Sequence, residues 1–292
     1  MSSGLDEVAV KQDLLPKRRS WLARSPLRRP LVVLSVLILL TAVLFAVAPG
    51  LFWPGDPMRL GAGPALAAPS WSEPFGTDQF GRSVLGQVIH GSRAAMMIGL
   101  LSVAIALTLG GLIGLLSGYF GGSVDMVLMR GIDVLMVFPS LLLALMFAAG
   151  LGPSLFNLIV AVGVASVPHY ARVTRGQVLA VRSRPYIDAA AAVGIPKGRI
   201  LFRHVVPNAI TPLVVVATLG VANGILLGAS LSFLGVGPTT GVPDWGRLLA
   251  AGEPFLGSAW WISTFPGLVV TLVVIAVNIL GDHLRDVLDV SK

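Results

Sequence analysis

The chain has 292 residues, of which 55% are hydrophobic and only 12% are charged, and its mean hydropathy is +0.85. Because an ordinary soluble domain carries about 25% charged residues, this composition excludes a soluble globular fold. The absence of cysteine excludes disulfides, thiolate chemistry and cysteine metal sites. The net charge of +7 is compatible with nucleic-acid binding, but the placement of the basic residues argues against it.

Long uncharged runs predict membrane-spanning helices, since about 30 Å of hydrocarbon needs about 20 helical residues. The run from Val134 to Ala171 carries no charge apart from a proton on His169. One helix of that length would measure about 57 Å, so we expect the run to fold back at the glycines and proline of residues 150–154. The sequence thus predicts six spans, at residues 31–48, 94–117, two within 134–171, 209–234 and 263–281.

The first hydrophobic run follows a basic stretch, as the hydrophobic part of a secretory signal does. The residues after it, APGLFWP, are bulky and rich in proline and offer no small-residue cleavage site. We therefore expect a retained helix.

Lysine and arginine are concentrated in two regions, and this asymmetry predicts the orientation. Residues 1–30 hold seven, and residues 172–203 hold seven more. The opposite side has four: Arg59, Arg82, Arg93 and Arg247. Both rich regions, and hence both termini, are expected in the cytoplasm.

The second basic region has the pattern of two short helices. Pro185 suits a first helical turn, residues 187–193 include four consecutive alanines, and Gly194 suits the left-handed end of a helix. A turn at 195–198 and a helix at 199–206 follow, which Pro207 is expected to stop. Alanine leaves little side chain in the way, so the loop suits contact with another surface, although an ordinary basic loop remains an alternative.

The stretch FGTDQFGRS, residues 75–83, precedes a helical stripe at Val84, Leu85, Val88 and Ile89. Thr77 or Asp78 is expected to cap a short amphipathic helix at the outer membrane surface. A structural role is favoured over contact with substrate.

Three charged residues, Asp125, Arg130 and Asp133, lie at the start of the third span. The i,i+3 spacing predicts an ion pair between Arg130 and Asp133; a proton relay is the less favoured alternative. The glycines of the second span predict close helix approach at Gly110, Gly111, Gly114 and Gly118. Tryptophans beside the spans predict an interfacial belt, formed by Trp53, Trp71, Trp245, Trp260 and Trp261.

Motifs for chemistry are absent from the sequence. It has no G-x-x-x-x-G-K-[ST] phosphate loop, no nucleophile elbow and no H-E-x-x-H. The four histidines lie on separate elements without metal-ligand spacing. We expect neither ATP hydrolysis nor a metal or cofactor site in this chain.

The order Asp188-Ala189-Ala190, Gly194 and Val206-Pro207-Asn208 resembles the "EAA" loop of ABC importer permeases, with Asp188 where that family more often has glutamate. Further segments resemble the dipeptide, oligopeptide and nickel permeases, C-type subunit, over residues 75–289. They are FGTDQFGRS with Ser83 in place of an acid, GYFGG at 118–122, FPS at 138–140, SFLG at 232–235, DWG at 244–246 and GDHLRD at 281–286.

This resemblance implies an all-α permease subunit of the type I ABC importer architecture in the plasma (inner) membrane, forming half of a pathway for short peptides. It implies a homologous second permease, two ATPase subunits or one fused ATPase that bind ATP and Mg, an extracytoplasmic binding protein, and membrane lipid, without nucleic acid. The expected ATPase contacts are Tyr186, Asp188, Ala189, Ala190, Gly194, Ile195, Pro196, Arg199, Phe202, Arg203, His204 and Pro207. The extracytoplasmic motif comprises Gly76, Thr77, Asp78, Gly81 and Arg82.

The expected organisation is a basic segment at 1–30, the first span with an outer segment at 31–93, a core at 94–283 containing the loop 182–208, and a tail at 284–292. A permease for nickel or another small solute is an alternative function. A stand-alone secondary transporter or channel is a second alternative, but it would need ionisable residues at the membrane centre and internal repeats. Neither is evident in the sequence.

Overall fold

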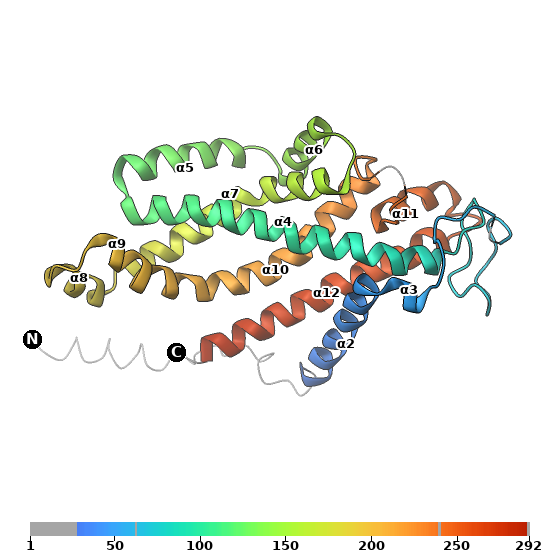
Figure 1. Ribbon diagram of the computed structural model, residues 1–292, viewed down its shortest axis with the longest axis horizontal. Coiled ribbons are helices and arrows are strands. Elements are labelled where there is room, and N and C mark those ends of the chain that lie inside the picture. Colours follow the sequence, from blue (N-terminus) through green and yellow to red (C-terminus); the bar gives the residue numbers. More distant parts are fainter. Residues whose placement is uncertain (1–27, 62, 239–240, 291–292) are drawn as a thin grey trace, which may run out of the picture.

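The computed structural model describes residues 28–61, 63–238 and 241–290, and this part of the chain is helical, with one isolated bridge between Thr77 and Ser83 in place of strands (Figure 1). The elements in chain order are α2 (Arg28–Val47), α3 (Pro49–Phe52), α4 (Val84–Phe120), α5 (Gly122–Met136), α6 (Ser140–Leu151), α7 (Leu155–Arg182), α8 (Pro185–Ala192), α9 (Lys197–Ile200), a π-helical turn (Leu201–Val205), α10 (Val206–Phe233), α11 (Trp245–Gly252), a 3₁₀ turn (Glu253–Phe255) and α12 (Trp261–Val290).

Five of these helices are long and apolar enough to cross a membrane, and α5 with α6 makes a sixth span if the bent pair is counted as one. The expected break after residue 150 is present, because α6 ends at Leu151 and α7 begins at Leu155. A second break was not predicted: α5 and α6 meet at 89°. Pro139 precedes α6 with an extended ψ of 136°, so the helix cannot continue through it.

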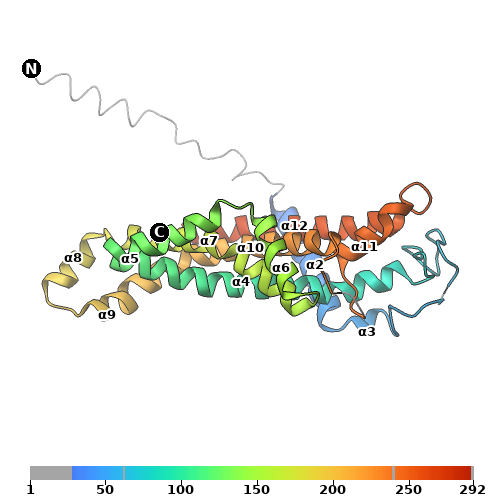
Figure 2. The same ribbon diagram turned by 90° about the horizontal axis from the view of Figure 1, so that it is seen from above.

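The long helices run side by side along the length of the molecule (Figures 1 and 2). α8 and α9 project at one end, called here the α8 end. The segment 53–83 and α11 lie at the opposite end, called the α11 end. α4, with 37 residues, is about 55 Å long, so the two ends lie on opposite sides of a bilayer.

α4 is longer than the sequence indicated. The expected amphipathic helix and the second span form one continuous helix, because no proline interrupts residues 84–120. Its N-cap is Ser83, whose hydroxyl accepts the Gly86 N–H at 3.4 Å; the prediction of Thr77 or Asp78 as the cap is wrong. The expected domain boundary at residues 93/94 therefore falls inside α4, and the one at 283/284 falls inside α12.

Glycine lets α4 lie directly against α7. A Cβ on Gly110 would stand 2.6 Å from the Val167 carbonyl oxygen, and one on Gly114 would overlap the carbonyl oxygen of Ala171. Gly118 is similarly close to α7, whereas Gly111 faces open space. The expected close approach is confirmed for three of the four glycines, at the i,i+4 spacing that lines one helix face.

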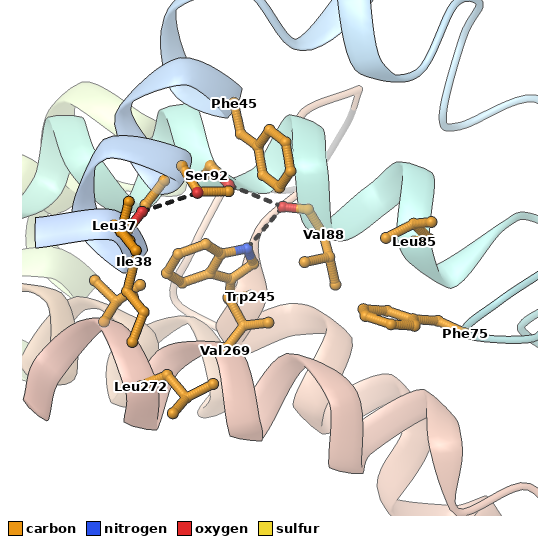
Figure 3. Close-up of a pocket in the computed structure, with 13 residues that line it drawn as sticks. Leu37, Ile38, Phe45, Phe75, Leu85, Val88, Ser92, Trp245, Val269 and Leu272 are labelled. Carbon is orange, nitrogen blue, oxygen red and sulfur yellow. Dashed lines mark hydrogen bonds between the residues drawn. The ribbon is translucent and has the colours of Figure 1, made fainter. Parts of the chain in front are cut away.

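Trp245 is buried in the main apolar cluster and is not exposed to lipid as an interfacial tryptophan would be, so the expected tryptophan belt is wrong at this position (Figure 3). Its indole N–H donates to the Val88 carbonyl of α4 at 3.0 Å. The ring lines a cavity of about 280 Å³ together with side chains of α2, α4 and α12, including Ile38, Leu85 and Val269. Trp261 is also buried, and its indole N–H donates to the Thr77 carbonyl at 3.0 Å. A buried indole needs a partner, and both rings find one in the backbone.

The acidic residues of α5 pair with α7 and not within α5. Asp125 accepts two hydrogen bonds from the Arg175 guanidinium, each at 2.6 Å, and a third from the Ser117 hydroxyl. Asp133 pairs with Arg172 at 2.7 Å. The prediction of an Arg130–Asp133 pair is wrong, because α5 packs alongside α7 and arginines of the neighbouring helix reach both carboxylates.

Candidate functional site

The part of the molecule at the α8 end, residues 183–205, forms a protrusion built on the ends of three long helices. Ile187 and Ala190 of α8 and Ile200 beyond it bury against Val178 of α7. The Tyr119 hydroxyl at the end of α4 donates to the Lys197 carbonyl at 2.6 Å. The protrusion is therefore packed onto the bundle as one small apolar cluster.

The first helix of the protrusion begins and ends as its sequence predicts. Pro185 occupies the first turn of α8. Gly194 has φ = +80°, and the next N–H, that of Ile195, donates to the Ala190 carbonyl at 3.2 Å. This is the left-handed glycine end of a helix, in which N–H groups beyond the helix satisfy its last carbonyls.

The second half of the protrusion departs from the expected pattern. Pro207 does not stop a helix, because α9 passes through a π-helical turn directly into α10. In that wider turn the Val206 N–H donates to Leu201, five residues back, and Pro207 follows directly as the second residue of α10. The Asn208 amide donates to the His204 carbonyl at 2.6 Å. The protrusion thus continues without a flexible joint into a membrane span.

The outer surface of the protrusion carries most of the residues expected to contact an ATPase. Ala190 is buried, and Ile195 and His204 are half-buried. The remaining nine are exposed: Tyr186, Asp188, Ala189, Gly194, Pro196, Arg199, Phe202, Arg203 and Pro207.

Two apolar side chains stand out on this surface. Phe202 is 71% exposed and Val193 is 77% exposed. Sequence reasoning placed Val193 in the helix without giving it a contact role. Its position directly before the terminal glycine, where a helix ends and its last side chain turns outward, is the signal that could have identified it. Exposed apolar groups flanked by Arg199 and Arg203 make a surface suited to a protein partner.

The motif expected to be extracytoplasmic lies at the α11 end and is held by its own contacts. The Thr77 hydroxyl donates to the Pro64 carbonyl at 2.6 Å and accepts the Ala67 N–H at 2.8 Å. The Asp78 carboxylate accepts the Arg82 Nε–H at 2.7 Å and the Gln87 amide at 3.0 Å, besides two backbone N–H groups. Thr77 and Asp78 are 0% and 1% exposed, so their side chains fix the loop against α4.

The two glycines of the motif permit this fold of the loop. Gly76 has φ = +68° and Gly81 has φ = +71°, a region that side chains rarely adopt. A Cβ on Gly76 would stand 2.7 Å from the Trp261 indole nitrogen. Arg82 lies over the Phe80 ring, 4.7 Å from its centroid. The five motif residues belong to one loop before α4, and this segment lies at the opposite end of the molecule from α8 and α9.

Among the described residues, no group of three or more histidine, aspartate or glutamate side chains is arranged to hold a metal ion.

The fold is that of transporter permeases. A chain of the MetNI methionine ABC transporter, in an inward-facing form, superposes with a TM-score of 0.57 at 17% identity, over 70% of this chain and 97% of that one. A chain of an amino acid ABC transporter gives a TM-score of 0.53 at 17% identity, over 70% and 92%. The described part of the chain is thus a helical bundle that shares its fold with chains of these ABC transporters.

The family follows from sequence. The chain belongs to the binding-protein-dependent transport system inner membrane component family, which matches residues 110–291. It is 38% identical to the dipeptide transport system permease protein DppC of Alkalihalophilus pseudofirmus, over 90% of this chain and 86% of that protein. It is 40% identical to the di/tripeptide permease DppC of Pseudomonas aeruginosa (88% and 86%) and 35% identical to the glutathione permease GsiD of Pectobacterium atrosepticum (99% and 96%). The expected resemblance is confirmed.

Proposed function

We propose that this chain is the translocation subunit of an ATP-driven importer of short peptides. The relatives are named for dipeptides, di- and tripeptides and the tripeptide glutathione, and they match along most of their length. A peptide is thus the substrate class common to them. The observation that carries the proposal is the protrusion, which gives a membrane bundle without its own phosphate loop a surface for a partner.

The partners follow from what this chain lacks. ATP and Mg would be bound by two ATPase subunits, or by one fused ATPase, that receive the protrusion. A homologous second permease would complete the pathway, and an extracytoplasmic binding protein would deliver peptide at the α11 end. The basic residues near residue 30 and in the protrusion would place the α8 end and both termini in the cytoplasm.

The geometry supports a mechanical link between an ATPase and the membrane. Motion imposed on α8 would pass through the buried cluster at its base to the end of α7, and through the π-helical turn to α10. The glycine contacts hold α4 against α7, so these helices would move together. Alternating access requires two stable arrangements of such a packed unit.

The test is reconstitution of the chain in proteoliposomes with candidate second permease, ATPase and binding protein. Dipeptide delivered with the binding protein is expected to stimulate ATP hydrolysis and to accumulate inside. Stimulation by a nickel chelate and not by dipeptide would replace peptide as the substrate, and uptake by this chain alone without ATP would contradict the importer itself.

A further inference from the structure

A groove of about 800 Å³ lies where α4, α6, α7 and α10 meet. Its polar lining includes Ser140 at the start of α6, Ser166 and His169 of α7, and Asn223 and Ser230 of α10. His169, Asn223, Ser230 and Ser140 are exposed, and Ser166 is half-buried. The volume is in the range of small-molecule sites, about 300–1,000 Å³.

The groove lies about halfway along α4 and α7. Ser102, on its wall, is 18 residues from each end of α4 (102 − 84 and 120 − 102). His169 is 14 residues after the start of α7 and 13 before its end (169 − 155 and 182 − 169). Residues midway along a span lie at the depth of the hydrocarbon core.

Polar side chains exposed at that depth are costly when they face lipid. Two other cavities of the bundle, of about 280 and 360 Å³, have almost wholly apolar linings, as lipid contact or helix packing requires. α2 likewise exposes leucine and valine along its length. The groove is therefore suited to contact with water or a polar solute and not with lipid.

One polar group of the groove has no partner within the described residues. Tyr170 is 3% exposed and its hydroxyl makes no hydrogen bond. The ring lies against Gly220 of α10, where a Cβ would overlap the hydroxyl. No side chain caps the start of α6, whose first residue, Ser140, lies on the groove wall.

We propose that this groove is the wall that the chain contributes to the translocation pathway, and that His169 and Asn223 hydrogen-bond the backbone amides of the passing peptide. The inference rests on the proposed function and adds where and how the peptide is held. Imidazole, carboxamide and hydroxyl groups can donate and accept, which matches the N–H and C=O of a peptide bond.

The charge of the groove fits the same occupant. None of its lining residues is aspartate, glutamate, lysine or arginine. Its neutral side chains would bind the backbone groups that every peptide shares. Its leucine and valine side chains bind without a directional requirement, so the groove admits peptides with different side chains. The groove thus favours a peptide over a metal ion, which requires anionic or clustered imidazole ligands.

Because the natural chain has no cysteine, single cysteines report directly on access to water. The assembled importer is reconstituted with the Asn223→Cys variant of this chain or, as a control, with the Thr271→Cys variant. Each preparation is exposed to a charged thiol reagent, and the increase in the mass of this chain measures the reaction. Thr271 is exposed on α12 between the exposed Leu268 and Ile275. We expect Asn223→Cys to react, more slowly with dipeptide and binding protein present, and Thr271→Cys to stay unreacted.

Uptake gives the second measurement. Asn223→Leu, checked for intact assembly by size-exclusion chromatography, is expected to lower dipeptide uptake about fivefold, the factor for one lost neutral hydrogen bond; Thr271→Val should match the natural chain. If the natural importer takes up peptide, either of two results would overturn the groove assignment. One is an Asn223→Cys variant that does not react, and the other is unchanged uptake by Asn223→Leu. Absence of peptide uptake by the natural importer would instead overturn the proposed function and the peptide occupant with it.

Discussion

At three positions on α4, a hydrogen in place of a side chain sets the distance to α7. Gly110, Gly114 and Gly118 face backbone and side-chain atoms that a Cβ would meet at 3 Å or less. In a membrane, close packing of this kind takes the place of a hydrophobic driving force between helices. Gly111, one residue away in the same helix, faces open space. A substitution at Gly111 is therefore a control for substitutions at the three packed glycines.

Gly114→Ala is expected to lower the thermal stability of the purified protein, because the new methyl group would overlap the Ala171 carbonyl and force α4 from α7. Overpacking of this kind costs about 1–3 kcal/mol. Gly111→Ala should leave the unfolding temperature unchanged or raise it, since alanine is the better helix former by about 1 kcal/mol. Thermal unfolding in one detergent measures both, and equal stability of the two variants would contradict the packing described.

At the scale of elements, α11 depends on its N-cap, the residue directly before the helix. Asp244 is 4% exposed, and its carboxylate accepts the Arg247 N–H at 3.0 Å as an N-cap. Burial raises the pKa of the Asp244 carboxyl above its ordinary 3.8, against the opposing effect of the backbone N–H groups of Arg247 and Gly246. The folded protein thus holds this proton to a higher pH than the unfolded chain does.

The sign of the effect follows from linkage. When the folded state binds the extra proton, stability falls as the pH rises from about 4 through the raised pKa. Asp244→Asn keeps a good cap without an ionisable group. Its unfolding temperature relative to the natural chain should therefore be higher at about pH 8, above the raised pKa, than at about pH 3, below the ordinary carboxyl pKa. Asp244→Ala loses the cap, at about 0.5–2 kcal/mol, at both values; a constant difference between the natural chain and Asp244→Asn would refute the linkage.

The sequence indicated the spans and the α8 helix well, because both depend on local signals: uncharged length, a proline at a helix start and glycine at its end. It failed where a distant partner decides the outcome. Arg130 was the neighbour of Asp133 in sequence, but Arg172 of another helix makes the pair. Trp245 lies beside a predicted span in the sequence, but its ring is buried in the core, where its indole N–H donates to a backbone carbonyl of α4.

Two local misreadings have a different origin. Pro207 was expected to end a helix, and a π-helical turn, which has no simple sequence signature, carries the helix past it. The groove polar residues are spread over α6, α7 and α10. No periodicity within one span could have brought Ser166, His169 and Asn223 together, since their common face exists only after the helices pack.

At the scale of the whole molecule, the protrusion and the groove are joined by α7 and α10. Both helices have one end in the protrusion cluster and their middle in the groove wall. Displacement of the protrusion would therefore reach the groove through two continuous helices. This connection is the central physical claim of the proposed importer.

Phe202 tests that claim most directly, because it is 71% exposed on the protrusion and contributes little to the fold. Phe156, at the opposite end of α7, has the same exposed fraction and is a matched control. In the reconstituted importer, Phe202→Ala is expected to lower ATP-driven dipeptide uptake about tenfold or more, as loss of an aromatic anchor does, while Phe156→Ala retains it. Uptake by Phe202→Ala equal to that of the natural importer would contradict a protrusion that receives the work of an ATPase.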